Sequence, residues 1–321
     1  MRCAVFEGDG RISLAATAIP HPAPGEVRVR VAACCLCGSD LRPYRQGWPV
    51  TPGHEIAGRV AHPGHRLDGR AVAVYIPVFC GNCPECEAGH TNVCRNLTDL
   101  VGWQRHGGYA EALNVPAQCL LEVPDDIPIA LAPLLLDTVG TSAHGIRLAA
   151  RIVASGPALV LGAGPIGLGA VIVLAQMGFS PIDVVEPAEP RRRMASELGA
   201  RIVDAGAVTE RYNLVIEASG KDAARQIALE RVAPLGAVVQ LGEADRWTVE
   251  ETRSIRRKDF YYIRSFYFPR SEWNANIEIF RAAPDRFARL VDTTTGLQGL
   301  GGLFAEFARG ERLKPALTFP L

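Results

Sequence analysis

Four closely spaced cysteines form a pattern that suits metal binding. Their spacing is C-x2-C-x2-C-x7-C, formed by Cys80, Cys83, Cys86 and Cys94. Four thiolates can surround one zinc ion in the closed tetrahedral geometry of a structural site. Iron–sulfur clusters also accept four thiolates, but the bacterial cluster spacing needs a further cysteine and a proline close behind Cys86, and neither is present there. We therefore predict a structural zinc in this lobe.

A second pair of candidate metal ligands lies earlier in the chain. Cys37, in Cys-Gly-Ser-Asp, and His54, in Gly-His-Glu, offer a thiolate and an imidazole. A catalytic zinc needs about three protein ligands and one open position for water or substrate. These two motifs do not by themselves reveal a third ligand, and a lone histidine beside a carboxylate is more often structural.

A glycine-rich loop predicts a dinucleotide site. Gly162, Gly164 and Gly167 fit G-x-G-x-x-G, with Pro165 and Ile166 between the last two glycines. A strand candidate runs into this loop and an apolar helix leaves it, which is the setting that such a site requires. Glycines let backbone amides and a helix N-terminus approach a pyrophosphate closely. We expect these five residues to contact a nicotinamide coenzyme.

Glu186 is expected to select between NAD and NADP. It follows the next strand candidate, 19 residues beyond Gly167. A carboxylate at that place accepts hydrogen bonds from the ribose hydroxyls and repels a 2′-phosphate, which favours NAD. Arg191 follows closely with two further arginines, and it either serves a cofactor phosphate or is solvated at a helix start.

The elements around these motifs fall into two kinds. Up to about residue 148 the chain is rich in Pro and Gly, and alternating runs such as Glu26–Val31 predict a β-rich domain. From about residue 150, strand candidates alternate with helical stretches, which predicts a parallel, doubly wound sheet. The strand candidates are Ala158–Leu161, Ile182–Val185, Leu214–Ile216 and Ala237–Val239, and the helical stretches include Glu189–Leu198 and Ala223–Val232.

Composition excludes several classes of protein. A chain of 321 residues suits two domains, and 34 basic residues balance 34 acidic ones, so no charge excess attracts nucleic acid or a membrane surface. The N-terminal segment lacks the apolar stretch of a signal peptide, so we expect the nine cysteines to lie in a reducing cytoplasm. The apolar run Ala158–Ala175 is interrupted by glycines and Pro165, which favours a strand–turn–helix over a membrane span.

These motifs, together with Gly107–Glu111, occur in the order found in zinc-dependent medium-chain dehydrogenases, and the sequence resembles that family over nearly its whole length. The resemblance implies an α/β protein with a GroES-like β-rich catalytic domain, a Rossmann coenzyme domain and an active site between them. The implied domains are 1–148 with the zinc lobe at 80–94, 149–264 for the coenzyme domain, and 265–321 as the return segment that completes the catalytic domain. It also implies two zinc ions per chain and a homodimer or homotetramer.

The resemblance assigns the remaining metal-site roles. Cys37 and His54 match two ligands of the catalytic zinc, and Asp137 falls where the family has its third ligand, normally Cys or Glu. Glu55 matches the acid that can approach the metal during ligand exchange, so it competes with Asp137 for the third place. The alternative for Asp137 is a helix cap.

The resemblance also implies roles in proton transfer and in coenzyme binding. Ser39 matches the hydroxyl that bonds the substrate oxygen, and Asp40 matches the acid that orients the ligand histidine. Arg42 stands where several relatives have a relay histidine, and a guanidinium cannot act as a general base at neutral pH. Arg42 is therefore expected to contact the pyrophosphate or a polar substrate, with Trp48 and Trp103 as candidate pocket residues. Thr141 and Leu241 are assigned to the coenzyme site.

The resemblance implies hydride transfer between NAD and a secondary alcohol. The expected substrate is a polyol, sugar or amino-alcohol, because a third zinc ligand other than Cys resembles that branch of the family. One alternative is an NADPH-dependent aldehyde or ketone reductase on the same fold, against which Glu186 argues. Another is a nicotinamide-binding sensor that has lost catalysis, against which the retained Cys37 and His54 argue.

Overall fold

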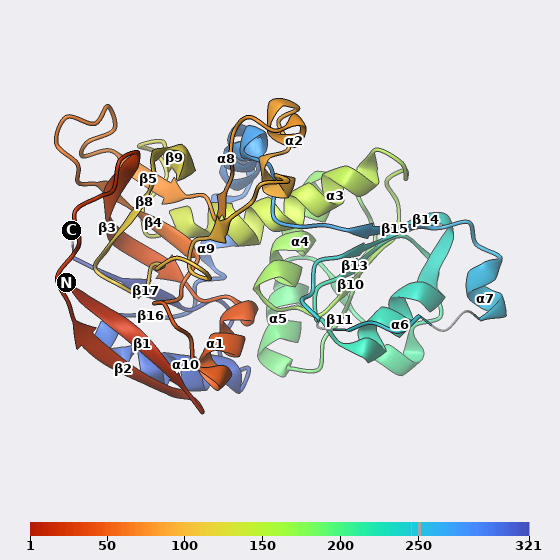
Figure 1. Ribbon diagram of the computed structural model, residues 1–321. Coiled ribbons are helices and arrows are strands. Elements are labelled where there is room, and N and C mark those ends of the chain that lie inside the picture. The colour runs from red at the N-terminus through yellow and green to blue at the C-terminus, as the bar shows by residue number, and fades with distance from the viewer. Residues whose placement is uncertain (245, 250–251, 321) are drawn as a thin grey trace. The chain divides into compact units, whose positions relative to one another are not determined.

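The computed structural model describes residues 1–244, 246–249 and 252–320, which form two compact units (Figure 1). Unit 1 comprises Met1–Leu136, Pro269–Trp273 and Val291–Leu321, and unit 2 comprises Asp137–Phe268 and Asn274–Leu290. The chain therefore leaves unit 1 once its β-structure is nearly complete and returns to it at the C-terminal end. The domain limits expected from the sequence, at 148 and 264, stay predictions.

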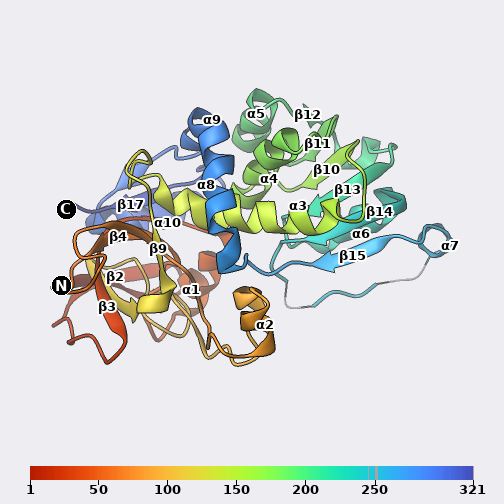
Figure 2. The same cartoon turned by 90° about the horizontal axis from the view of Figure 1, so that it is seen from above.

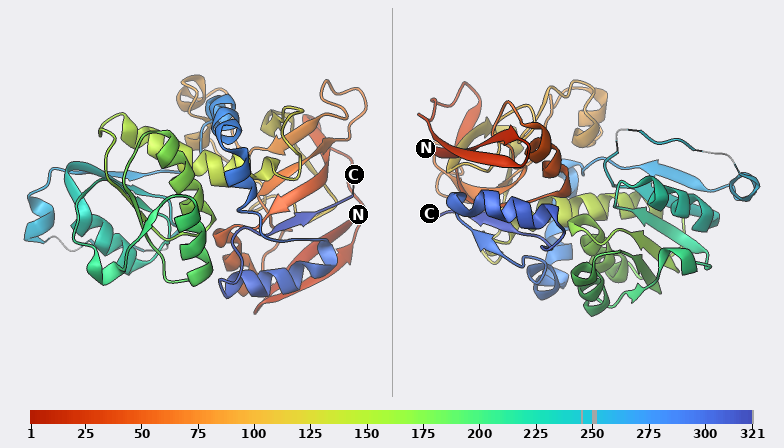
Figure 3. Two further views of the ribbon diagram at one scale, coloured as in Figure 1. Left: turned by 180° about the vertical axis from the view of Figure 1, so that it is seen from behind. Right: turned by 90° about the horizontal axis from the view of Figure 1, so that it is seen from below.

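Unit 1 is built on antiparallel strands. Its largest sheet follows the order β16–β17–β3–β4–β5–β9, with β8 also paired to β3, and two smaller pairs are β1–β2 and β6–β7. Its helices include α1 (Leu41–Gln46), α2 (Pro84–Glu87) and α10 (Leu300–Ala308), and Figure 3 shows α10 beside the β1–β2 hairpin. The strands are β1 Arg2–Gly8, β2 Arg11–Ala16, β3 Glu26–Cys35, β4 Glu55–Val60, β5 Ala71–Val74, β6 Pro77–Val78, β7 Asp99–Leu100, β8 Ala112–Pro116, β9 Leu120–Glu122, β16 Thr294–Thr295 and β17 Ala316–Thr318.

Strand β3 shows how the sequence pattern forms this sheet. Val27, Val29 and Val31 are buried, while the alternate side chain of Arg30 is exposed, so one face of the strand contributes to the core. The predicted strand Glu26–Val31 is confirmed and extends four residues further, to Cys35. The extension matters because it leads directly into the Cys37 motif.

Unit 2 contains a parallel six-stranded sheet in the order β12–β11–β10–β13–β14–β15, which Figure 2 shows strand by strand. This is the doubly wound order of a dinucleotide-binding domain, so the predicted fold class is confirmed. The strands are β10 Ala158–Leu161, β11 Ile182–Val185, β12 Arg201–Ile202, β13 Tyr212–Glu217, β14 Val232–Gln240 and β15 Tyr261–Arg264. The helices are α3 Ser142–Ala150, α4 Pro165–Gln176, α5 Glu189–Glu197, α6 Asp222–Arg231, α7 Arg253–Arg256, α8 Trp273–Ala282, which begins in unit 1, and α9 Pro284–Ala288.

Most of the predicted elements of unit 2 agree with the structure. Strands β10 and β11 have the predicted bounds, and α5 ends one residue before the predicted Leu198. The apolar run Ala158–Ala175 forms β10, a turn and most of α4, because glycines and Pro165 end the strand and begin the helix. Within the described part of the chain, no helix has both the length and the apolar character needed to span a bilayer.

Candidate functional site

The pairing of two strands brings Cys37 and His54 together. Cys37 follows β3 and precedes a short 3-10 turn, η1 (Gly38–Asp40), while His54 directly precedes β4. Strands β3 and β4 are antiparallel, with Cys35 opposite Glu55 in the register. The end of one strand therefore faces the start of the other, and both candidate ligands are buried at that end of the sheet.

Asp40 orients both candidate ligands. Its Oδ2 accepts hydrogen bonds from the backbone N–H of Cys37, at 2.9 Å, and from the hydroxyl of Tyr109, at 2.7 Å. Its Oδ1 lies 3.1 Å from Nδ1 of His54. Because Nδ1 faces Asp40, Nε2 of His54 remains to coordinate a metal. Burial, followed by the charge of Asp40, raises the pKa of Tyr109, so this hydroxyl stays protonated as a donor.

Four buried residues offer candidate ligand atoms at this place. Cys37, His54, Glu55 and Asp137 each present one such atom, and these atoms all lie within 4.8 Å of one another. Asp137 directly follows Leu136 in the chain and lies in η5 (Leu136–Thr141), a π-helical turn. Such turns occur often at functional sites. Its Oδ1 accepts a hydrogen bond of 3.0 Å from the hydroxyl of Thr141, one turn further on.

Glu55 pairs with Lys314, a residue that was not among the predicted site residues. The two side chains form an ion pair, and both are fully buried. Burial alone would lower the pKa of Lys314, but the electrostatic effect of Glu55, followed by those of Cys37 and Cys35, outweighs burial, and the pKa is raised. The signal in the sequence is a lysine between apolar residues just before β17, which pairs with β3.

Arg42 lies beside two tryptophans in unit 1. Its guanidinium carbon lies 5.0 Å from the ring centroid of Trp103 and 5.5 Å from that of Trp48. Trp48 donates a hydrogen bond of 2.7 Å from Nε1 to the carbonyl oxygen of Trp103, and the two rings meet edge to face. The Trp103 ring also packs against the ring of His54, with centroids 5.5 Å apart. Ser39 is half-buried in η1, on the same stretch as Asp40.

The four-cysteine lobe has the dimensions of a zinc site. The sulfur atoms of Cys80, Cys83, Cys86 and Cys94 all lie within 4.8 Å of one another, and Cys94 Sγ is 3.5 Å from Cys80 Sγ and 3.8 Å from Cys83 Sγ. Zinc–sulfur bonds of about 2.3 Å in a tetrahedron place sulfurs roughly 3.8 Å apart. A hydrogen bond from the backbone N–H of Asn82, with smaller contributions from side chains, lowers the pKa of Cys80 to about 6. These distances and this thiolate suit a metal.

In unit 2 the glycine loop follows β10 and begins α4. Gly162 has a φ of +94°, and an added Cβ at Gly167 would lie 1.9 Å from the carbonyl oxygen of Gly162, so the turn excludes side chains there. Gly164 caps α4 and faces open space, with Pro165 and Ile166 in the first turn. This arrangement leaves the helix N-terminus accessible to an anion.

Glu186 lies directly after β11 and against the glycine loop. Its Oε2 accepts a hydrogen bond from the backbone N–H of Ala163, at 2.7 Å, and its Oε1 accepts one from Ala188, at 2.9 Å. Arg192 pairs with Asp204 at 3.2 Å, so it is held in a structural contact. Arg191 is half-buried and its Nε lacks a hydrogen-bond partner.

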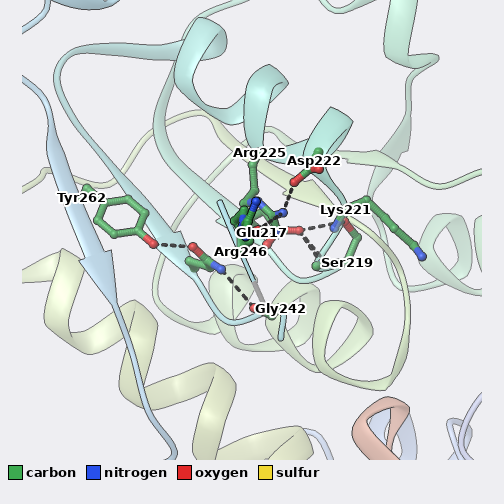
Figure 4. Close-up of polar contacts among 10 residues, drawn as sticks. Glu217, Ser219, Lys221, Asp222, Arg225, Gly242, Arg246 and Tyr262 are labelled. Carbon is green, nitrogen blue, oxygen red and sulfur yellow. Dashed lines mark hydrogen bonds and ion pairs between the residues drawn. The ribbon is translucent and has the colours of Figure 1, made fainter. Parts of the chain in front are cut away.

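The turn after β13 packs against the glycine loop, and Figure 4 shows the polar contacts within this turn. Glu217 is fully buried, and its Oε1 accepts hydrogen bonds from the backbone N–H of Ser219 (2.8 Å), the hydroxyl of Ser219 (2.7 Å) and the backbone N–H of Gly220 (2.8 Å). An added Cβ at Gly162 would lie 2.8 Å from Ser219 Cβ, so this turn packs on the loop. Leu241 follows β14 and donates its backbone N–H to the carbonyl oxygen of Glu217, at 2.8 Å. Glu217 is absent from the residues predicted from sequence, although an acid ending an apolar strand is a detectable signal.

Comparison with known proteins identifies the family. The alcohol dehydrogenase GroES-like domain matches residues 23–125, and the glucose dehydrogenase C-terminus matches residues 141–297. L-threonine 3-dehydrogenase of Pyrococcus furiosus is 34% identical over 248 residues, which cover 70% of this chain and 70% of that protein. The chain belongs to the zinc-type alcohol dehydrogenase family. The resemblance stated from the sequence motifs is thus confirmed.

Two further relatives span more of this alcohol dehydrogenase chain. The 2-dehydro-3-deoxy-L-galactonate 5-dehydrogenase of Pseudoalteromonas atlantica is 28% identical over 305 residues, 88% of each chain. The structure of the alcohol dehydrogenase from Thermus sp. ATN1 superposes with a TM-score of 0.90 and 27% identity, covering 100% of both chains. Family membership means that the protein is an oxidoreductase of small-molecule alcohols, and it implies zinc and a nicotinamide coenzyme.

Proposed function

We propose that the protein is a zinc- and NAD-dependent dehydrogenase that oxidises a secondary alcohol of the polyol, sugar or amino-alcohol class to its ketone. The observation that carries this proposal is the buried group formed by Cys37, His54, Glu55 and Asp137. One thiolate, one imidazole and one carboxylate provide three zinc ligands and leave a position for the substrate oxygen.

Asp137 is the proposed third ligand, and Lys314 supports this choice. Lys314 forms its buried ion pair with Glu55, so one oxygen of Glu55 is already committed to a cation. Asp137 accepts a hydrogen bond from the neutral hydroxyl of Thr141 through Oδ1, and it offers one carboxylate oxygen to the same buried group as Cys37 and His54. Together with the four-cysteine lobe, this assignment gives two zinc ions per chain.

Proton transfer is proposed to begin at Ser39. A zinc ion held by Cys37, His54 and Asp137 would supply a Lewis acid for the carbinol oxygen, and a nicotinamide coenzyme at the glycine loop would supply the hydride acceptor. The hydroxyl of Ser39 takes the alcohol proton as its own proton passes to water. Asp40 holds the His54 ring in a fixed orientation through Nδ1, and the glycine loop with Gly162, Gly164 and Gly167 positions the coenzyme.

The choice of NAD rests on Glu186. Its carboxylate lies at the end of β11 beside Ala163, where it can accept hydrogen bonds from ribose hydroxyls and would repel a 2′-phosphate. The alternative is NADP with a reductase role, and one observation favours it: the Nε of Arg191 has no hydrogen-bond partner among the described residues and would suit a phosphate oxygen. Thr141 and Leu241 are further proposed coenzyme contacts.

The names of the relatives favour a polar substrate with several oxygen atoms. L-threonine 3-dehydrogenase and 2-dehydro-3-deoxy-L-galactonate 5-dehydrogenase are named for an amino acid and a sugar acid. We also propose a homodimer or homotetramer, because β15 ends the order of the parallel sheet and carries the exposed aromatic side chains of Tyr261 and Tyr262.

The test combines metal analysis with a substrate screen. The purified protein, assayed with NAD and with NADP against polyols, sugars and amino alcohols, should reduce NAD with at least one secondary alcohol and contain two zinc ions per chain. Cys37→Ala serves as the control and should lose that turnover. Equal turnover in this variant, or no oxidation of any alcohol in the screen by the wild type, would contradict the proposal.

A further inference from the structure

Arg42, Trp48 and Trp103 form a cluster that we call the arginine clamp. The guanidinium carbon lies 5.0 Å and 5.5 Å from the two ring centroids, and the rings themselves meet edge to face with centroids 5.7 Å apart. The hydrogen bond from Trp48 Nε1 to the carbonyl oxygen of Trp103 fixes one tryptophan against the backbone of the other. The cation is therefore held in one place by two rigid side chains.

The clamp adjoins the candidate metal ligand His54. The Trp103 ring packs on the His54 ring, with centroids 5.5 Å apart and an interplanar angle of 34°. Arg42 also follows Asp40 by two residues, and Asp40 contacts Nδ1 of the same histidine. The guanidinium of Arg42 and the ring of His54 therefore both contact the ring of Trp103.

The chemistry of this cation points to binding. A guanidinium keeps its charge at every pH at which the protein is folded, so it neither accepts nor relays a proton. A guanidinium has five N–H donors, so one that packs against aromatic rings can still donate from its edge in the fork that matches a carboxylate. Its single positive charge matches a monoanion better than a phosphate dianion.

We propose that Arg42 is a specificity-determining residue that binds a carboxylate of the substrate. The alcohol that is oxidised is then a hydroxy acid, such as a sugar acid or a hydroxy amino acid, and not a neutral polyol. This inference rests on the proposed function, since it narrows the substrate class of that same site. The pyrophosphate of the coenzyme is the other source of anionic oxygens that Arg42 could bind.

The experiment compares matched alcohols with and without a carboxylate, such as an aldonic acid and its alditol, in the zinc-loaded protein. The wild type should favour the acid in kcat/KM by about tenfold or more, which is the gain expected from one hydrogen bond between charged groups. Arg42→Met should lose this preference, with a fall of about 10- to 100-fold on the acid and little change on the alditol. Arg42→Lys should restore part of it. Arg45→Met, which removes an exposed cation from the same helix α1, is the matched control and should behave as wild type.

Binding measurements separate the two sources of anion. Titration of the protein with NADH alone should give the same Kd for the wild type and Arg42→Met. A weaker Kd for NADH in Arg42→Met, with the preference for acids kept, would assign Arg42 to the pyrophosphate and overturn the inference. Equal kcat/KM of the wild type for acid and alditol would also overturn it, while the proposed function would stand.

Failure of the proposed function has a different signature. If the wild type oxidises neither member of any pair, the proposed function is wrong. Calorimetry then tests separately whether the arginine clamp binds a carboxylate. Titration of the NADH complex with an aldonic acid should show binding in the wild type and Arg45→Met that Arg42→Met has lost. Equal binding, or no binding, in all three proteins would overturn the role of Arg42.

Discussion

At the scale of single residues, the environment of each carboxylate decides its role. Asp40 contacts Cys37 and Tyr109 through Oδ2 and His54 through Oδ1. Both of its oxygens are therefore used to position other groups. Glu55 pairs with Lys314, whereas Asp137 accepts a hydrogen bond from a neutral hydroxyl. Three acids near one another thus divide into an orienting group, a paired group and a candidate ligand.

Asp137→Asn should remove one zinc ion of two and depress turnover severely, because a neutral amide oxygen is a poorer zinc ligand than a carboxylate. The four-cysteine site lies in a separate lobe and should keep its metal. Zinc content per chain and kcat are the measurements. Retention of both zinc ions and full activity would mean that Glu55, or a residue outside this group, is the third ligand.

Lys314→Met should destabilise the protein by about 3–5 kcal/mol, because it leaves the buried charge of Glu55 without its cation. The raised pKa of Lys314 means that its contribution is fully present below its unfolded pKa of about 10.4, so the loss should stay constant from about pH 6 to pH 9.

Urea unfolding of the zinc-loaded protein measures this loss. Lys221→Met removes an exposed lysine and should change the free energy of unfolding by less than about 0.5 kcal/mol. The double variant Glu55→Gln, Lys314→Met should recover part of the loss, since neither charge remains buried. An equal effect of the two lysine substitutions would show that the buried pair contributes nothing particular to stability.

At the scale of elements, strand ends and helix starts hold the functional groups. The β3–β4 pairing brings Cys37 and His54 to one end of an antiparallel sheet. The β10–α4 turn brings the glycine loop to the carboxyl end of a parallel strand, and the turn after β13 packs on it. In both units, rigid sheets position the turns, and the turns carry the candidate functional residues.

Gly164→Ala should weaken coenzyme binding about tenfold or more without changing Tm, since a methyl group would occupy the open space where the pyrophosphate approaches. Gly206→Ala is the matched control, because an added Cβ there also meets nothing within 4 Å but lies away from the loop. Titration with NADH and thermal unfolding give the two readouts. Unchanged NADH affinity in Gly164→Ala would argue against this loop as the pyrophosphate site.

At the scale of the whole molecule, the candidate zinc ligands Cys37 and His54 belong to unit 1 and the glycine loop belongs to unit 2. Each unit has its own sheet and its own buried core. Loss of a metal ligand in one unit should therefore leave the coenzyme-binding fold of the other intact.

His54→Ala should abolish turnover, yet its Kd for NADH should stay within about twofold of wild type, because His54 and the glycine loop belong to different units, each with its own core. Steady-state assays and NADH fluorescence titration measure the two properties. If His54→Ala lost NADH binding together with turnover, zinc binding and coenzyme binding would have to be coupled.

Features that depend on local spacing could be predicted from the amino-acid sequence alone. The four cysteines, the glycine loop and strands β10 and β11 all lie within short segments, where periodicity and the steric freedom of glycine leave few alternatives. Their elements could be predicted with nearly correct bounds, and the family followed from the order of the motifs.

Contacts between residues far apart in the sequence became visible only in the folded chain. Lys314 lies 259 residues from Glu55, Tyr109 lies 69 from Asp40, and Trp103 lies 55 from Trp48. Such pairs follow no sequence period, because strand pairing and core packing bring them together after the chain has turned many times. A buried lysine or tyrosine is tolerated only where a partner satisfies it, and that partner is selected by the fold and not by spacing along the chain.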